Sequence, residues 1–397
     1  MHVEGLDYQS GKPIRLGIKD GKIADVVYLP KAKKYLPVIA PGLVDLQVNG
    51  YGGVDFNTTQ LMASDVNRVV QMLAKQGVTT FFPTLITNTD DSIRKALATI
   101  VLACKTYPEA ASAIGGIHLE GPFISKEDGA RGAHDPQLVQ KPDWELFQQW
   151  QTIAEEKIKI ITLSPEWTGS DEFIARCTKS GVIVSIGHTA ATPEQIDRAV
   201  KAGGRLSTHL GNGTHLMLPR HPNYIWEQLA QDKLWTSVIA DGFHLPDSFL
   251  KIIFKVKSET AILISDCTYF AGLNPGTYNS HIGGEVMLSP EGRLSLANQP
   301  NLLAGSAQSL LWCVNQVVRK NLLSLKDAWN KASLKPLEVL TGKSQSVFKA
   351  GEPANLVLFE QKQTEINILQ TILSGEIVYL HSDDYKNDFA SFSSWGS

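Results

Sequence analysis

Gly116-Ile117-His118-Leu119-Glu120-Gly121-Pro122-Phe123 is the stretch of sequence that indicates the fold most directly. A short apolar run leads into Glu120, and the Gly121-Pro122 pair stops the strand immediately afterwards. The sequence therefore predicts a carboxylate at the carboxyl end of a buried strand, where the chain turns into a loop. In a barrel of parallel strands, that end forms the face that carries the active site.

Seven more apolar runs of this kind occur along the chain, and amphipathic stretches separate them. The runs cover residues 44–48, 80–85, 158–163, 182–186, 205–209, 237–241 and 261–266. Helices are expected after Ser64-Asp65, over residues 90–105, and from Thr192-Pro193 to Gly203. Eight strand–helix units predict an α/β fold, a (β/α)8 TIM barrel. The alternative is a doubly wound parallel sheet, whose site would lie at one switch point.

The two ends of the chain have β pattern. Asp20-Gly21 lies between two short β-type runs, which is typical of a tight hairpin. After the eighth strand, residues 301–320 and 324–340 are predicted to be helical, and strands are expected again at 354–359 and 376–379. The predicted segments are a small β-sandwich domain from residues 1–42 and 345–383, a catalytic barrel from 43–344, and a loose tail from 384–397.

Composition restricts the possible partners. The chain has 397 residues, is 43% hydrophobic and carries a net charge of -3, so a nucleic-acid partner is not expected. No run of about 18 apolar residues is present to cross a membrane. The first residues lack the pattern of a signal peptide, and the four cysteines have no paired spacing. These features predict a cytoplasmic protein without a disulfide frame.

Titratable side chains stand at the ends of several predicted strands. Glu120, His188 and His209 form a ligand set typical of catalytic zinc with one position open to water. We expect one divalent ion per chain, zinc first, with iron and cobalt as alternatives. Asp266 ends the eighth strand and is the expected general base, the alternative being a structural acid that caps the next loop.

A set of short motifs occurs in order between residues 41 and 306. The motifs are Pro41-Gly42-Leu43-Val44-Asp45, His118-Leu119-Glu120-Gly121-Pro122, Gly132-Ala133-His134, Gly187-His188-Thr189, Thr208-His209-Leu210 with Asn212, Ala240-Asp241-Gly242-Phe243-His244, Asp266, and Leu303-Ala304-Gly305-Ser306. This ordered set resembles the N-acetylglucosamine-6-phosphate deacetylases of the amidohydrolase superfamily. The resemblance implies a barrel of the metal-dependent amidohydrolase type, and both chain ends fit the family's small β domain.

The resemblance implies roles residue by residue. Glu120, His188 and His209 would hold the metal. Asp266 would be the catalytic base, and His134 would contact the substrate carbonyl. Arg220 matches the family's phosphate-binding Arg, and His244 matches a His that reaches phosphate across a homodimer interface. The other implied substrate contacts are Ala133, Asn212, Gly213, Leu303, Ala304 and Gly305.

The implied reaction converts N-acetylglucosamine 6-phosphate to glucosamine 6-phosphate and acetate, in amino-sugar catabolism or cell-wall sugar recycling. Asp266 would take a proton from water and return it to the leaving amine, while the metal and His134 stabilise the oxyanion. Alternatives are an amidohydrolase on N-acetylgalactosamine 6-phosphate or a cyclic amide, a non-catalytic sugar-phosphate sensor, and a sugar-phosphate isomerase or epimerase. Arg220 and His244 favour a phosphorylated substrate, and the intact metal ligands with Asp266 argue against a sensor.

Several positions depart from related patterns. Gln47 and Asn49 stand where many amidohydrolases have His-x-His, and Leu163-Ser164-Pro165-Glu166 offers no Lys for a bridging carbamate. Because amides are poor ligands for transition metals, we expect one metal and a hydrogen-bonding role for Gln47 and Asn49 around it. Gly213 and Cys267 also differ from the family pattern, which leaves the identity of the sugar open.

Overall fold

The barrel is made of eight parallel strands. The structure is a computed structural model that describes residues 1–31, 36–280, 284–363 and 365–381, so the tail predicted at 384–397 lies outside it. The strands are β5 Leu43–Val48, β8 Val78–Ile86, β9 Ile117–Glu120, β10 Ile158–Leu163, β11 Ile183–Ile186, β12 Leu206–Ser207, β13 Trp235–Ile239 and β14 Ala261–Ile264. They pair in chain order. Beyond β14, Cys267 bridges to Val48 of β5, which nearly closes the barrel. The predicted fold class is confirmed.

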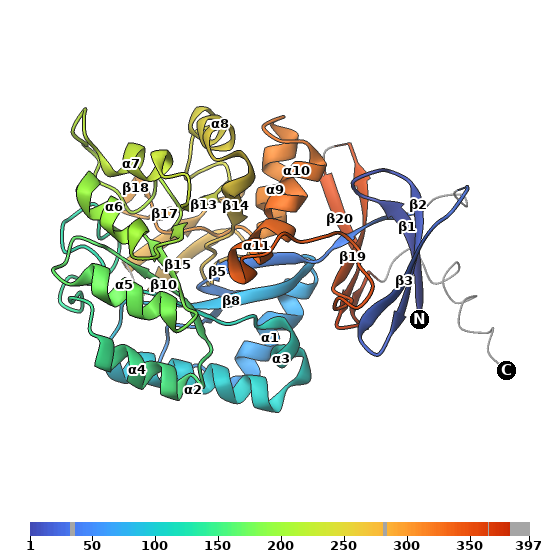
Figure 1. The fold of residues 1–397 in the computed structure, drawn as a ribbon, viewed down its shortest axis with the longest axis horizontal. Coiled ribbons are helices and arrows are strands. Elements are labelled where there is room, and N and C mark those ends of the chain that lie inside the picture. The colour runs from blue at the N-terminus through green and yellow to red at the C-terminus, as the bar shows by residue number, and fades with distance from the viewer. Residues whose placement is uncertain (32–35, 281–283, 364, 382–397) are drawn as a thin grey trace.

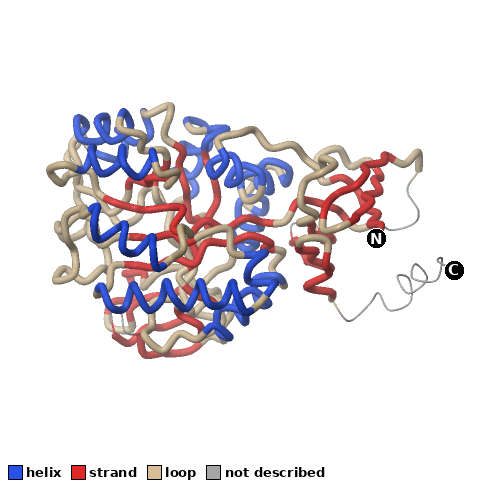
Figure 2. The backbone as a smooth tube through the Cα atoms, turned by 60° about the horizontal axis from the view of Figure 1, so that its bottom comes forward, coloured by secondary structure: helices blue, strands red, loops and turns tan. Residues whose placement is uncertain are grey.

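Helices surround these strands (Figures 1 and 2). They are α1 Ala63–Ala74, α2 Asp90–Thr106, α3 Pro108–Ala113, α4 Trp144–Ile153, α5 Ser170–Lys179, α6 Pro193–Lys201, α7 Tyr224–Ala230, α8 Asp247–Val256, the 3₁₀ turn η1 Ser258–Thr260, α9 Leu310–Arg319, α10 Leu325–Lys331 and α11 Leu334–Thr341. Thr192 caps α6 as predicted, accepting from the Gln195 N–H. The start of α1 was wrongly placed, because Asp65 lies inside the first turn and accepts the Met62 N–H at 3.1 Å.

No helix in the described part of the chain is long and apolar enough to cross a membrane.

The two chain ends meet in one seven-stranded sheet, which lies beside the barrel in Figure 1. Its strands are β1 His2–Asp7, β2 Pro13–Lys19, β3 Lys22–Tyr28, β4 Val38–Pro41, β19 Leu356–Lys362, β20 Glu365–Leu373 and β21 Glu376–Leu380. At the predicted β2–β3 hairpin, Asp20 and Gly21 have φ of 51° and 74°, as a type I′ turn requires. The division at residues 42 and 345 remains our proposal for the domain boundary.

The segment after the eighth strand differs from the prediction. A four-stranded antiparallel sheet follows β14, so residues 301–303 are strand rather than helix. Its strands are β15 Gly276–Ser280, β16 Gly284–Leu288, β17 Leu294–Leu296 and β18 Gln299–Leu303. This sheet packs on its own apolar cluster, which includes Phe270, Val286 and Leu294. The helix predicted over 324–340 is two helices, α10 and α11, and Ser333 at the break donates to the Trp329 carbonyl.

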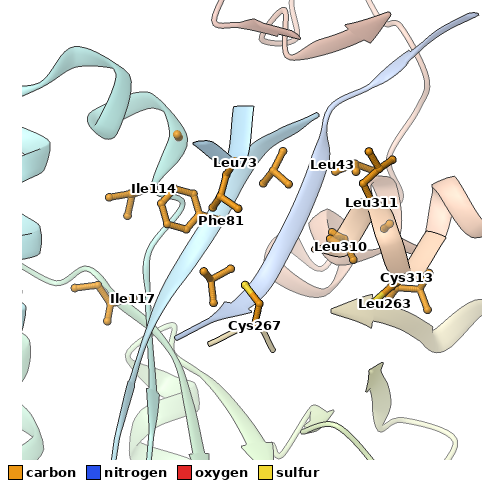
Figure 3. Packing of buried hydrophobic residues seen from close by; sticks show 14 of the residues in the cluster. Leu43, Leu73, Phe81, Ile114, Ile117, Leu263, Cys267, Leu310, Leu311 and Cys313 are labelled. Atoms are coloured by element: carbon orange, nitrogen blue, oxygen red, sulfur yellow. The ribbon is translucent and has the colours of Figure 1, made fainter. Parts of the chain in front are cut away.

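A continuous apolar core joins the barrel to the surrounding helices. Figure 3 shows Leu43 of β5, Phe81 of β8 and Leu73 of α1, together with Leu263 of β14 and Leu310 of α9. All five side chains are buried and belong to one cluster. This packing fixes the strands, and it therefore fixes the residues at their carboxyl ends.

Candidate active site

Three side chains converge at the carboxyl ends of β9, β11 and β12. Glu120 is the last residue of β9, while His188 and His209 lie two residues beyond the ends of β11 and β12. Oε1 of Glu120 lies 3.2 Å from Nε2 of His188 and 2.9 Å from Nε2 of His209, and the two Nε2 atoms are 3.1 Å apart. Tetrahedral ligands bonded to zinc at about 2.0–2.2 Å have comparable separations. The donor set and its spacing therefore fit a divalent cation.

The backbone at these positions is unusual. His188, His209 and Asp266 have φ of 48°, 29° and 48°, in the left-handed region that residues other than glycine seldom adopt. Such strain is found preferentially at functional sites. Nδ1 of His188 lies 3.2 Å from the Ala130 carbonyl, which directs Nε2 toward Glu120.

The buried carboxylate of Glu120 is held in its charged form. Burial alone would raise its pKa, but hydrogen bonds from His188 and His209 bring it well below the usual range. Burial would lower the pKa of His209, yet the contact with Glu120 raises it. Gln47 donates from Nε2 to Oε1 of Glu120 at 2.9 Å, which is the kind of contact expected of this amide.

Asp266 lies beside these residues, two positions after β14. Burial of the carboxylate raises its pKa to about 6, and the negative charge of Glu120 adds to the shift. Asn49 donates from Nδ2 to Oδ1 of Asp266 at 2.7 Å and so orients it. A carboxylate with a pKa close to neutrality suits a general base that must later act as an acid.

His134 packs against the ring of His188, with ring centroids 4.4 Å apart. Burial lowers its pKa to about 3, so the imidazole is neutral and can donate one hydrogen bond. Its Nδ1 lies 2.8 Å from the hydroxyl of Thr87, a residue that the sequence analysis missed. His134 also has a ligand-capable atom within 4.8 Å of those of Glu120 and His188. We propose His209 as the third ligand, because its Nε2 lies 2.9 Å from Oε1 of Glu120 and 3.1 Å from Nε2 of His188.

One cavity of about 370 Å³ brings most of the predicted residues together. Its lining includes Asn49, Glu120, Ala133, His134, His188, His209, Asn212, Gly213, His244, Asp266, Leu303, Ala304 and Gly305. It also includes Asp55, Asn57, Thr268, Tyr269 and Ser280, which the sequence analysis did not single out. A larger cavity of about 540 Å³ lies between α9, the β15–β18 sheet and the seven-stranded sheet, and none of the predicted residues lines it.

The two predicted phosphate contacts, Arg220 and His244, lie in different places. Arg220 is exposed on the loop after β12 and does not line the cavity that the described residues form. His244 lines the cavity of its own chain, whereas the prediction has it reach the site of a second chain. Its Nδ1 lies 2.7 Å from Oδ2 of Asp241, which fixes the ring.

The chain requires a glycine at position 213, because a side chain there would collide with the proposed metal ligand His188. Gly213 has a φ of 57°, and a Cβ built there would lie 2.6 Å from Nδ1 of His188. We expect Gly213→Ala to weaken metal binding about 10- to 100-fold, because it displaces His188. The matched control is Gly11→Ala, which has a φ of 67° and nothing within 4 Å of the added Cβ. Equal metal affinities for the two variants, measured by chelator competition, would contradict this expectation.

The comparisons with known proteins agree with this geometry. The sequence model of the amidohydrolase family matches residues 38–378, so the chain belongs to the amidohydrolase family. Bacillus subtilis N-acetylglucosamine-6-phosphate deacetylase is 31% identical over 387 residues, covering 93% of each chain. The Bos taurus enzyme of the same name is 31% identical over 357 residues, covering 86% of this chain and 83% of the relative. Within the amidohydrolases, the chain therefore belongs to the N-acetylglucosamine-6-phosphate deacetylases, as its motifs indicate.

The fold agrees over nearly the whole chain. The crystal structure of N-acetylglucosamine-6-phosphate deacetylase from Thermotoga maritima superimposes with a TM-score of 0.81 at 26% identity. The match covers 96% of this chain and 100% of that one.

Proposed function

We propose that the chain is a metal-dependent hydrolase that converts N-acetylglucosamine 6-phosphate to glucosamine 6-phosphate and acetate. The observation that carries this proposal is the convergence of Glu120, His188 and His209 within 3.2 Å of one another, in the same cavity as Asp266 and His134. A volume of about 370 Å³ is in the range of small-molecule sites. Membership of the deacetylase family supports the substrate.

We propose that each chain binds one divalent ion, held by Glu120, His188 and His209. Zinc is the ion that we favour. When bound, the ion lowers the pKa of the attacking water and polarises the acetyl carbonyl. Gln47 and Asn49 support a single ion. A second ion would need further ligands such as imidazoles, whereas these two side chains are amides that donate hydrogen bonds to Glu120 and Asp266.

The remaining steps are assigned to side chains of the cavity. Asp266 takes a proton from the attacking water as the oxygen adds to the acetyl carbon. His134 donates a hydrogen bond to the oxyanion that develops on the carbonyl oxygen. Asp266 then delivers its proton to the nitrogen while the carbon–nitrogen bond breaks, so that the free amine leaves with acetic acid, which keeps the second proton of the water and ionises to acetate. Asn212, Gly213, His244 and the segment 303–305 are proposed to bind the sugar phosphate.

Thr87 is proposed to select the tautomer of His134. If its hydroxyl donates to Nδ1, the proton of the neutral ring lies on Nε2, where it can face the substrate. Thr87→Val keeps the shape and removes the hydroxyl, so we expect kcat to fall up to about 10²-fold, as for the loss of an oxyanion donor. Thr87→Ser is the control and should recover most of kcat. An unchanged kcat in the Val variant would exclude this role.

We propose a cytoplasmic homodimer. The location is supported by the four cysteines, all free of disulfides in the structure. The dimer is supported by Leu216 and Met217, which are 91% and 88% exposed on the loop that carries Arg220. We propose that this loop packs on a second copy of the chain. In that position the guanidinium of Arg220 would reach a substrate phosphate. Sedimentation of the wild type and of Leu216→Ser/Met217→Ser would test the contact.

The test of the reaction is acetate release by metal-loaded protein. Three substrates are compared: N-acetylglucosamine 6-phosphate, N-acetylglucosamine, and N-acetylgalactosamine 6-phosphate. We expect the first to be hydrolysed with the highest kcat/KM. Faster turnover of the galacto epimer would reassign the sugar, and no turnover of any substrate by protein with metal bound would overturn the proposal.

A further inference from the structure

The loop after β10 carries a carboxylate, Glu166, that the proposed reaction does not use. Its Oε1 accepts a hydrogen bond from the Ser125 hydroxyl at 2.9 Å. Its Oε2 accepts bonds from the Ser164 hydroxyl at 2.8 Å and from the Ala190 N–H at 2.9 Å. These donors stand on the loops that follow β9, β10 and β11. One side chain therefore joins three successive loops at the face that carries the proposed active site.

The same contacts hold the backbone around His188. The Ser125 N–H donates to the His188 carbonyl at 2.9 Å, while the Ser125 hydroxyl is bound by Glu166. Thr189, the next residue, lies 2.7 Å from the Ser164 hydroxyl through its own hydroxyl. We call Glu166, Ser125, Ser164, Thr189 and Ala190 the Glu166 cluster. The cluster therefore holds the backbone carbonyl of His188 and the two residues that follow it in the chain, Thr189 and Ala190.

His188 needs this support because its conformation is strained. Its φ of 48° is costly for a residue with a side chain, and a change in φ would swing the imidazole. The ring must keep Nε2 3.2 Å from Oε1 of Glu120 and 3.1 Å from Nε2 of His209. A metal site is precise only when its ligands are held by a rigid surrounding shell. The Ala130 carbonyl supports the ring, and the Glu166 cluster supports the backbone.

We propose that Glu166 is a positioning residue for the metal centre, acting through His188. It does not line the 370 Å³ cavity formed by the described residues, so it is placed to touch neither substrate nor ion. A carboxylate is suited to this role because Ser125, Ser164 and Ala190 all donate hydrogen bonds to it. A hydroxyl can either donate or accept, but the Ala190 N–H can only donate and so requires an acceptor. This inference rests on the metal assignment made above.

The test is the affinity for Co²⁺ of the full-length Glu166→Gln protein. Gln has the size of Glu but presents one NH₂ group, so the Ser125 hydroxyl must either turn to accept from it or lose its contact, and the support of Ser125 for His188 is disturbed in both cases. We expect the dissociation constant for Co²⁺, measured by chelator competition, to rise about 10- to 100-fold. The visible absorption of bound Co²⁺ should change as well, because the geometry of one ligand changes. Ser164→Ala, which removes the link between Glu166 and Thr189, is expected to act in the same direction.

The controls separate this inference from the proposed function. Glu172→Gln on α5 removes an exposed carboxylate and should bind Co²⁺ as the wild type does. Dissociation constants for Glu166→Gln and Ser164→Ala within twofold of the wild type would overturn the positioning role and leave the metal centre intact. Failure of the wild type itself to bind Co²⁺ would overturn the metal centre and the inference with it. If Glu166→Gln does not fold, the result for Ser164→Ala decides.

Discussion

Replacing Asp266 with Asn is expected to lower kcat for acetate release about 10²- to 10⁴-fold while the metal content stays unchanged. An amide has the size of the carboxylate but cannot take a proton from water or return one to the leaving nitrogen. The contact with Nδ2 of Asn49, 2.7 Å in the wild type, can be kept by the amide oxygen, so the geometry should persist. Steady-state kinetics and metal analysis of the same preparation measure both quantities.

The pH profile gives a second measure of the same role. The pKa of Asp266 is raised to about 6 by burial and by the charge of Glu120. Because the base must be ionised, kcat/KM should fall as the pH drops through this pKa, and a bound cation would move that fall to lower pH. The Asn variant should lack this acid limb. Asp232→Asn, at an exposed position, is the control. Near-normal kcat in Asp266→Asn with metal bound would refute the assignment.

The barrel could be predicted because its strands are buried on both faces. Such strands are continuous apolar runs, and each of the eight predicted runs overlaps a strand of the structure. The β15–β18 sheet could not be predicted in this way. Its strands are short and largely exposed, and Val286, Leu288 and Leu294 are the buried apolar residues among them, so their pairing leaves little periodicity in the sequence. This sheet leads directly into Ala304 and Gly305, which line the cavity.

The site was predictable where residues follow strand ends, and less so elsewhere. Glu120, His188, His209 and Asp266 end apolar runs, and the motif order adds His134 and most of the substrate contacts. Thr87 and Glu166 also follow strand ends, β8 and β10, but their roles could not be predicted because their partners His134 and Ser125 stand 47 and 41 residues away in the sequence. Arg220 was predicted from the family resemblance alone, and in the structure its loop is exposed. Its contact with a phosphate remains a proposal.

Glu120→Gln is expected to abolish both metal binding and acetate release. Glu120 supplies the one negative charge among the three proposed ligands, and its Oε1 is the atom nearest to both imidazoles. An amide oxygen is a poor ligand for a transition metal, so we expect the metal content after desalting to fall below about a tenth of the wild-type value. Activity should fall below detection, since the remaining residues cannot activate water without the ion.

The pH dependence of metal binding should change in the same variant. Contact with Glu120 raises the pKa of His209, although burial alone would lower it. In the wild type, protons therefore compete with the metal for His209 up to a higher pH than they would without Glu120. Metal affinity of the wild type should therefore increase with pH until His209 is neutral. Glu120→Gln removes the carboxylate that raises the pKa of His209. Any residual metal affinity of this variant should therefore reach its plateau at a lower pH than that of the wild type.

Thermal unfolding distinguishes a lost ligand from a damaged fold. Zinc at about 100 times its dissociation constant stabilises a folded protein by about 2.7 kcal/mol, so the wild-type Tm should rise when zinc is added. The Tm of Glu120→Gln should not respond to zinc, while Glu172→Gln, which alters only an exposed ion pair with Arg176, should respond as the wild type does. A zinc-dependent rise in the Tm of Glu120→Gln equal to that of the wild type would show that Glu120 is not a ligand. The cation would then have to be reassigned to the imidazoles, with His134 as the next candidate because it lies within 4.8 Å of the same cluster.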